Sequence, residues 1–193
     1  MTGLLLCGGK SSRMGSDKGL LPAQGITWAE NAYHKLASVV SPIFISVNDV
    51  QLATYAKHFS ETQLIVDNDQ LNIGGPLRGL LSMHMHLPQE DILLFACDLL
   101  FMETVVFDEL LLQQKKLPAK EAFVFTQDKE AEPLCGIYTA KGLGKILNAY
   151  QNAVLGKHSM KHILKTLDTS LTALPKEWEH CFKNINTRQD LNS

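Results

Sequence analysis

Residues 4–18, LLLCGGKSSRMGSDK, decide how this sequence can fold. The apolar run ends at Gly8 and Gly9, and the two cations Arg13 and Lys18 follow it. That order predicts a buried strand that leads into a phosphate-binding loop, because glycine lets the backbone approach a ligand closely. Successive N–H groups of such a loop can form a concave anion site, and the cations would add charge-assisted hydrogen bonds to phosphate oxygens.

The segment matches neither of the two best-known phosphate loops. Gly-x-x-x-x-Gly-Lys-Ser/Thr is absent, and so is Gly-x-Gly-x-x-Gly, because Gly8 and Gly9 are adjacent and Lys10 and Ser11 follow. Taken one at a time, Arg13 and Lys18 would be interpreted as solvated surface charges. Their position after the glycines at a strand end favours contact with phosphate.

Composition indicates one globular domain, residues 1–193, with a sizeable core, since 45% of the residues are hydrophobic. A net charge of -2 gives no electrostatic attraction to nucleic acid or to anionic membranes, so neither partner is expected. The four cysteines are far apart, and we find no secretory signal and no apolar stretch near the ~20 residues of a spanning helix. These features predict a cytoplasmic protein with reduced thiols.

Short apolar runs alternate with amphipathic stretches along the chain. The predicted strands are Gly3–Cys7, Ile43–Asn48, Gln63–Asp67, Asp91–Cys97, Ala122–Thr126 and Pro133–Tyr138, and the predicted helices are 27–40, 49–58, 76–86, 103–116, 141–152 and 159–167, followed by an extended piece at 182–185. The alternation predicts an α/β fold of three layers with a doubly wound, mostly parallel sheet. The short polar link before Pro133–Tyr138 suits a hairpin, so one antiparallel strand is expected.

Polar residues follow the predicted strands at Asn48, Asp67 and Asp98. In open α/β sheets, ligands bind outside the carboxyl ends of the strands. Asp98 could hold Mg²⁺ together with nucleotide phosphates, or it could cap a helix; beside a phosphate loop, the metal interpretation is favoured. Asn48 and Asp67 could hydrogen-bond a nucleobase, or they could be turn residues.

Together these segments resemble the molybdenum cofactor guanylyltransferases, a branch of the nucleotidyltransferase superfamily. The resemblance rests on LLLCGGKSSRMGSDKGLL, on SVN ending at Asn48, on Asp67, and on GGPLRGLL, FACD, EPLCGIY and NINT. Three positions depart from the family pattern. Cys7 stands where the family usually has alanine, Leu100 where proline is common, and His158 where arginine is frequent.

The resemblance implies a Rossmann-like nucleotidyltransferase fold and transfer of GMP from GTP to molybdenum-loaded molybdopterin, with release of pyrophosphate. It implies Mg²⁺ as cofactor and transient contact with molybdoenzymes or their chaperones. The implied catalytic residues are Arg13, Lys18 and Asp98, with Asp98 as metal ligand; the implied nucleotide-binding residues are Leu6, Cys7, Gly8, Gly9, Lys18, Asn48, Asp67 and Asp98; the implied contacts to the second substrate are Lys157, His158, Asn184 and Asn186.

Three other functions remain open at this point. The first is a cytidylyltransferase of the same cofactor, and the second is a sugar-phosphate nucleotidyltransferase. The third is a non-catalytic nucleotide-binding adaptor that delivers the cofactor.

Overall fold

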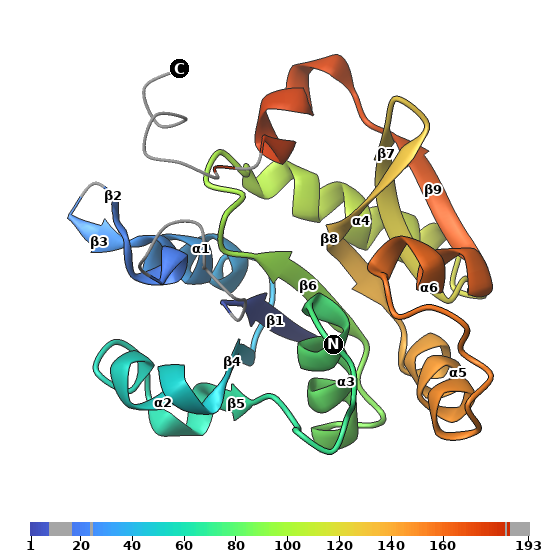
Figure 1. Ribbon diagram of the computed structural model, residues 1–193. Coiled ribbons are helices and arrows are strands. Elements are labelled where there is room, and N and C mark those ends of the chain that lie inside the picture. Colours follow the sequence, from blue (N-terminus) through green and yellow to red (C-terminus); the bar gives the residue numbers. More distant parts are fainter. Residues whose placement is uncertain (8–16, 24, 184, 186–193) are drawn as a thin grey trace.

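The computed structural model describes residues 1–7, 17–23, 25–183 and 185 of the 193-residue chain. Its centre is a sheet of seven strands in the order β5-β4-β1-β6-β8-β7-β9 (Figure 1). The strands are β1 (Thr2–Leu6), β4 (Ile43–Val47), β5 (Leu64–Val66), β6 (Ile92–Ala96), β7 (Ala122–Gln127), β8 (Glu130–Tyr138) and β9 (Thr169–Ala173). Only β8 pairs antiparallel to its neighbours β6 and β7, so the expected mostly parallel sheet with one antiparallel strand is confirmed.

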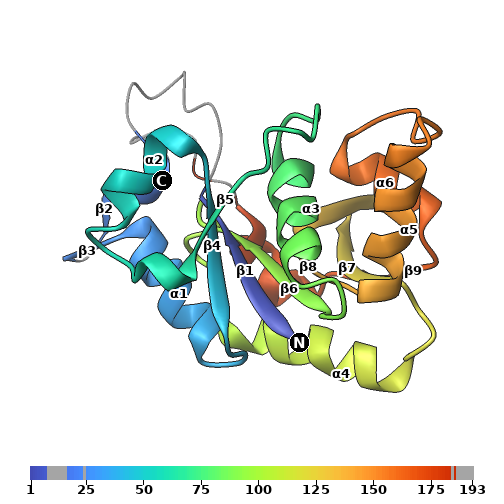
Figure 2. The same cartoon turned by 90° about the horizontal axis from the view of Figure 1, so that it is seen from below.

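Helices cover both faces of the sheet, which confirms the three predicted layers (Figure 2). They are α1 (Trp28–Ala37), α2 (Asp49–Tyr55), α3 (Pro76–His86), α4 (Thr104–Lys116), α5 (Ala140–Gln151) and α6 (Met160–Thr166), with the 3-10 turns η1 (Lys18–Leu20), η2 (Glu61–Gln63) and η3 (Lys176–Phe182). Helices α1, α2 and α4 pack on one face, and α3, α5 and α6 on the other. Among the described helices, none is long and apolar enough to cross a membrane.

Alternation along each strand sends side chains to the two faces in turn. In β1, Leu4 and Leu6 join the apolar cluster under α3, α5 and α6, whereas Leu5 and the following Cys7 join the cluster under α1, α2 and α4. All four are less than a tenth exposed. Burial on both faces is why this segment is apolar at every position.

The strand order reverses at β1, because the chain first runs to β4 and β5 on one side and then to β6 on the other. The carboxyl end of β1 is therefore the topological switch point, where open α/β sheets bind their ligands. Leu6 pairs with Ala96, so Cys97 and Asp98 follow β6 beside the end of β1.

Local signals set several element boundaries. Thr27 and Glu30 form a capping box: the Glu30 N–H donates to Thr27 Oγ1 (3.2 Å), and the Thr27 N–H donates to Glu30 Oε2 (2.7 Å). The helix that it starts ends at Ala37, three residues before the predicted end at Val40.

Several elements of the described chain were not predicted. The strand β9 has the polar sequence TSLTA and lies at the sheet edge, where Leu171 is 58% exposed, so little apolar patterning marks it. A small hairpin joins β2 (Pro22–Ala23) and β3 (Ile26–Thr27). Near the C-terminus the predicted extended piece is wrong at Phe182, which ends η3.

Candidate nucleotide site

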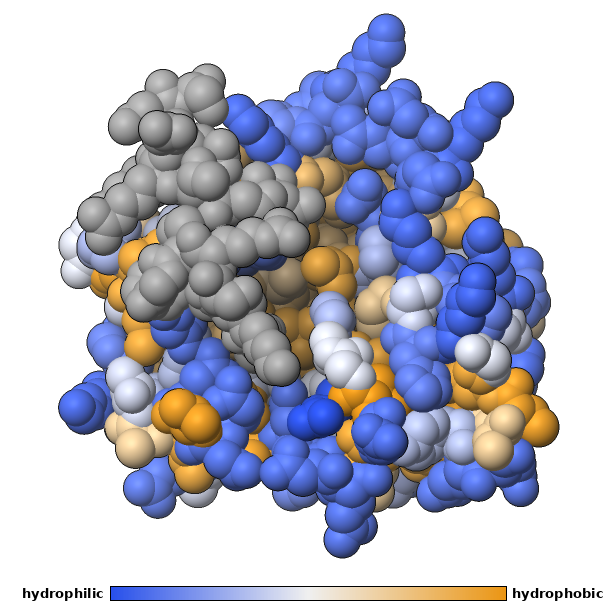
Figure 3. All heavy atoms as spheres, in the orientation of Figure 1, coloured by the Kyte–Doolittle hydropathy of each residue, from blue (hydrophilic) through white to orange (hydrophobic). Residues whose placement is uncertain are grey.

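The residues predicted for nucleotide binding follow four neighbouring parallel strands. Cys7 follows β1 and its neighbour Leu6 is the last residue of that strand; Asn48, Asp67 and Asp98 directly or closely follow β4, β5 and β6. Because parallel strands end at the same edge of a sheet, these residues lie along one rim. In the space-filling view, polar residues predominate and the apolar residues form small separate groups (Figure 3).

The structure brings Lys18 and Asp98 together. Lys18 starts η1, and its Nζ donates to the carbonyl of Ile185 (3.3 Å). The N–H of Ile185 in turn donates to the carbonyl of Asp98 (3.3 Å). The ammonium of Lys18 also interacts electrostatically with the Asp98 carboxyl. The two described residues that were predicted to act in catalysis are therefore neighbours, although 80 positions separate them in the sequence.

The Asp98 carboxyl suits a cation. Its Oδ1 is buried and accepts no hydrogen bond from the described residues, whereas buried polar atoms are normally satisfied. Burial raises the pKa of Asp98, and the charge of Lys18 only partly offsets this effect. The alternative of a helix cap is excluded, because α4 has Glu103 as its N-cap. Carboxylate oxygen is the ligand type that Mg²⁺ prefers, so this residue fits the expected metal.

Asn48 and Asp67 have structural partners. Asn48 caps α2, since its Oδ1 accepts the N–H of Gln51 (3.0 Å). Ser46 Oγ donates to Asp67 Oδ1 (2.6 Å), and burial raises the pKa of Asp67. Their roles toward a nucleobase stay predictions.

Two of the residues predicted for a second substrate, Lys157 and His158, lie elsewhere on the surface. Lys157 and His158 are exposed in the loop between α5 and α6. The His158 ring meets Tyr150 edge-on (5.7 Å between centroids), and both line a pocket of about 380 Å³ with Asn72. Asn72 belongs to the loop after β5, so this pocket opens near the same edge of the sheet as the nucleotide site.

Several predicted residues lie outside the described part of the chain: Gly8, Gly9, Arg13, Asn184 and Asn186. Ile185, between the two asparagines, is described and fully buried against Leu21 and Trp28. This packing holds Ile185 beside the site, where its backbone contacts Lys18 and Asp98.

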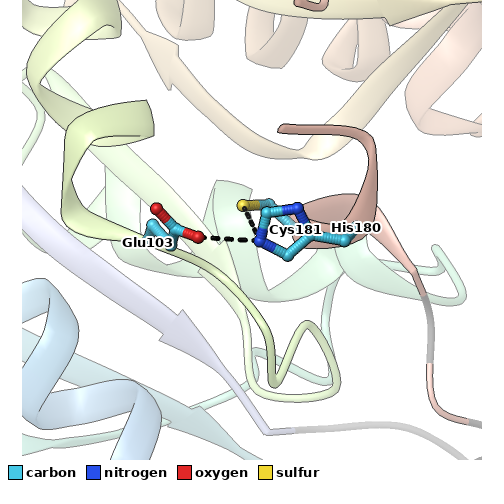
Figure 4. A group of neighbouring side chains, drawn as sticks. All are labelled: Glu103, His180 and Cys181. Atoms are coloured by element: carbon cyan, nitrogen blue, oxygen red, sulfur yellow. Dashed lines mark hydrogen bonds and ion pairs between the residues drawn. The ribbon is translucent and has the colours of Figure 1, made fainter. Parts of the chain in front are cut away.

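A second polar group lies behind the Asp98 loop. Glu103, at the start of α4, points toward His180 and Cys181 of η3 (Figure 4). The Glu103 carboxylate and the Cys181 sulfur both approach the same ring nitrogen, His180 Nε2, at 2.7 and 3.6 Å. A nucleophilic triad needs its acid and its nucleophile on opposite ring nitrogens, so this is not one. Burial also raises the pKa of the Cys181 thiol. The hydrogen bond between Glu103 and His180 connects the start of α4, which follows the loop after Asp98, to η3.

Sequence reasoning missed three residues of this rim: Asp17, Gln51 and Tyr55. The Asp17 carboxylate accepts hydrogen bonds from Gln51 Nε2 (2.5 Å), Tyr55 OH (3.1 Å) and the Gly19 N–H (3.0 Å). Two signals were present in the sequence. Gln51 stands three residues after Asn48, as in a capping box, and Tyr55 stands four residues further on the same helix face.

A doubly wound sheet with a lysine and a buried carboxylate at its switch point is the architecture of nucleotide-binding α/β proteins. Within that class, the chain belongs to the MobA-like NTP transferase domain family, whose profile matches residues 3–171. The family predicted from the motifs is confirmed.

Similar proteins carry names from molybdenum cofactor biosynthesis. A probable molybdenum cofactor guanylyltransferase of Flavobacterium johnsoniae is 28% identical, over 100% of this chain and 95% of that protein. The molybdenum cofactor biosynthesis bifunctional protein of Synechocystis sp. is 29% identical over 97% of this chain, which spans about half (52%) of that longer protein. The solved structure of molybdopterin-guanine dinucleotide biosynthesis protein A from Archaeoglobus fulgidus has a TM-score of 0.79 at 21% identity, over 100% of this chain and 95% of that one, and supports the fold.

Proposed function

We propose that this protein transfers GMP from GTP to molybdenum-loaded molybdopterin, which releases pyrophosphate and forms the guanine dinucleotide form of the cofactor. The observation that carries the proposal is the proximity of the Lys18 ammonium at the switch point to the Asp98 carboxyl, whose buried Oδ1 accepts no hydrogen bond from the described residues. Family membership and the similarity to guanylyltransferases across nearly the whole chain support the choice of reaction.

In the proposed reaction, a terminal phosphate oxygen of molybdopterin forms a bond to the α-phosphorus of GTP. The bond from that phosphorus to the oxygen bridging to the β-phosphate breaks, and pyrophosphate leaves with the electron pair. The nucleophile is already ionised, so the protein supplies no general base. Most of the rate enhancement in such transfers comes from in-line positioning and from neutralising charge.

Several of the predicted site residues that the structure describes have a part in this scheme. The Lys18 ammonium binds phosphate oxygens and stabilises the charge that develops on the leaving group. Asp98 would hold Mg²⁺, and the chemistry supplied by the bound ion is neutralisation of the triphosphate charge. Asp67 is the candidate acceptor for the N–H donors on the pairing edge of guanine. The exposed loop with Lys157 and His158 is the candidate contact for molybdopterin.

We infer the wider setting from the same reaction. A labile product is passed on by direct transfer, so brief contact with molybdoenzymes or their chaperones is expected. A cytoplasmic location suits the GTP substrate.

A nucleotide panel tests the proposal. Binding of GTP, CTP, ATP and UTP is measured with and without Mg²⁺, and pyrophosphate release is measured with molybdenum-loaded molybdopterin as acceptor. We expect release with GTP and dependence on Mg²⁺. Preferential use of CTP would contradict the guanine assignment but would still agree with nucleotidyl transfer. Nucleotide binding without pyrophosphate release would favour a delivery adaptor.

A further inference from the structure

We propose that Gln51 is a positioning residue for the phosphate side of the site: it holds Asp17, and through Asp17 it holds Lys18. The effect on catalysis rests on the proposed function, whereas the effect on the structure can be tested without it.

Gln51 joins three segments through one side chain. Its Oε1 accepts the Asn48 N–H (3.0 Å), and its Nε2 donates to the Cys7 carbonyl (3.1 Å) and to Asp17 Oδ2 (2.5 Å). The start of α2, the end of β1 and the residue before Lys18 are thereby connected. Only one orientation of the amide fits, because a flipped amide would place its oxygen against two acceptors, the carbonyl and the carboxylate.

Tyr55 completes the contacts to the Asp17 carboxylate. It lies one helical turn beyond Gln51 and donates its hydroxyl to Asp17 Oδ1 (3.1 Å), which also accepts the Gly19 N–H (3.0 Å). Burial raises the pKa of Tyr55, so the phenol stays protonated and remains a donor at neutral pH. A Cβ on Gly19 would lie 2.1 Å from the Tyr55 oxygen, which explains the glycine beside Lys18.

These contacts determine where the backbone of Lys18 lies. Asp17 is its immediate neighbour, and both oxygens of that carboxylate are held by α2. At the other end of the side chain, Lys18 Nζ meets the Ile185 carbonyl beside Asp98. A displacement of about 1 Å in a catalytic group can cost about 100-fold in rate. Gln51 therefore acts on the reaction without a contact to the substrate.

Gln51→Glu is the sharpest test. The variant keeps the oxygen that accepts from Asn48 but replaces both donated hydrogen bonds with repulsion against the Cys7 carbonyl and the Asp17 carboxylate. We expect kcat for pyrophosphate release to fall about 10- to 100-fold. The KM for GTP should change by less than about threefold, because Lys18 is misplaced mainly with respect to the developing charge.

Gln63→Glu is the matched control. Gln63 occupies the same capping-box position in η2, where its Oε1 accepts from the Ser60 N–H (3.3 Å) and its Nε2 donates to Tyr33 OH (2.8 Å). It precedes β5 and so lies at the opposite edge of the sheet from the site. The same chemical change there should leave kcat at the wild-type value.

A second substitution separates positioning from a merely structural role. Asp17→Asn in the Gln51→Glu background restores the hydrogen bond between positions 51 and 17 with donor and acceptor exchanged. The repulsion against the Cys7 carbonyl remains, so kcat should recover in part, by at least about threefold. A role confined to stability would lower the unfolding temperature together with kcat and would not be rescued.

Hydrogen exchange of the Gly19 amide gives a readout that needs no turnover, because that amide donates to Asp17. Exchange should be faster in Gln51→Glu than in Gln63→Glu. If the wild-type protein released no pyrophosphate with any nucleotide, the proposed function would fail, and this exchange would still test the contact. Wild-type kcat and wild-type Gly19 exchange in Gln51→Glu would overturn the inference, and so would loss of kcat without rescue by Asp17→Asn.

Discussion

At the level of single residues, Asp98 is a site residue whose buried charge destabilises the folded protein. A buried carboxylate oxygen with no donor among the described residues is unfavourable for folding. Its pKa is raised above the ordinary value, chiefly by burial. Such strain is common where a residue must receive a charged ligand. Removal of the negative charge of Asp98 should therefore increase stability and decrease activity.

Asp98→Asn should abolish most pyrophosphate release while it raises the unfolding temperature at neutral pH without Mg²⁺. A carboxyl whose pKa is raised in the fold destabilises the fold above that pKa, and at acidic pH it is neutral in both states. The gain in stability should therefore shrink as the pH falls through the folded pKa. Thermal unfolding from acidic to neutral pH measures it, with the exposed Asp108→Asn as control. Pyrophosphate release at the wild-type rate in Asp98→Asn would show that the metal assignment is wrong.

At the level of elements, the start of α3 shows why a motif needs its glycines. Gly75 has a φ of +72°, a conformation that favours glycine, and Pro76 follows as the first helical residue. One turn later, Gly79 packs so closely on β4 that an added Cβ would lie 2.3 Å from Ser46 Oγ and 3.2 Å from Asp67 Oδ1. The Gly-Pro-Leu-x-Gly block thus has a packing role that brings α3 against the Ser46–Asp67 hydrogen bond.

Gly79→Ala should destabilise the protein by about 1–3 kcal/mol, although alanine is the better helix former, because the methyl group overfills the contact with Ser46. Urea unfolding measures the loss. Gly144→Ala, within α5, is the matched control, since its added Cβ would have only His84 Nε2 within reach, at 3.8 Å. That variant should be neutral or stabilised by up to about 1 kcal/mol. Equal effects of the two substitutions would contradict the packing explanation.

At the level of the whole molecule, Glu121 connects the part of the sheet that lies beyond β8. It directly precedes β7, is 6% exposed, and accepts the N–H of Asp168 (2.9 Å) before β9 and the ammonium of Lys145 (3.1 Å) on α5. The hydrogen bond from the Asp168 backbone is the largest cause that lowers the pKa of Glu121, and Lys145 adds to it. One buried carboxylate therefore ties two strands and a helix together.

Glu121→Gln should lower the free energy of unfolding at pH 7 by about 1 kcal/mol, the difference between hydrogen bonds to charged and neutral acceptors. Because the folded pKa is depressed, the contribution is present above the unfolded value of 4.5 and is lost as the pH falls through the folded pKa. Urea unfolding at several pH values measures it. Glu130→Gln provides the contrast, since the pKa of Glu130 is also lowered but its ion pair with Lys161 is exposed, and a much smaller effect is expected.

The order of residues along the chain was enough to predict the three layers, the single antiparallel strand and the family. These depend on local features: apolar runs of strand length, helical spacing, and glycines and cations after the first strand. The polar residues at the strand ends could be predicted for the same reason, since parallel strands end at one edge. The edge strand β9 escaped prediction because its sequence is polar and short.

Contacts between distant segments came only with the folded structure. Lys18 meets Ile185 across 167 positions, Gln51 meets Asp17 across 34, and Glu103 meets His180 across 77. No periodicity or spacing specifies such pairs, because each depends on which loops the strand order places side by side. The chemistry of the site could be proposed from residue types, whereas the residues that hold it in position became visible only once the sheet had brought them together.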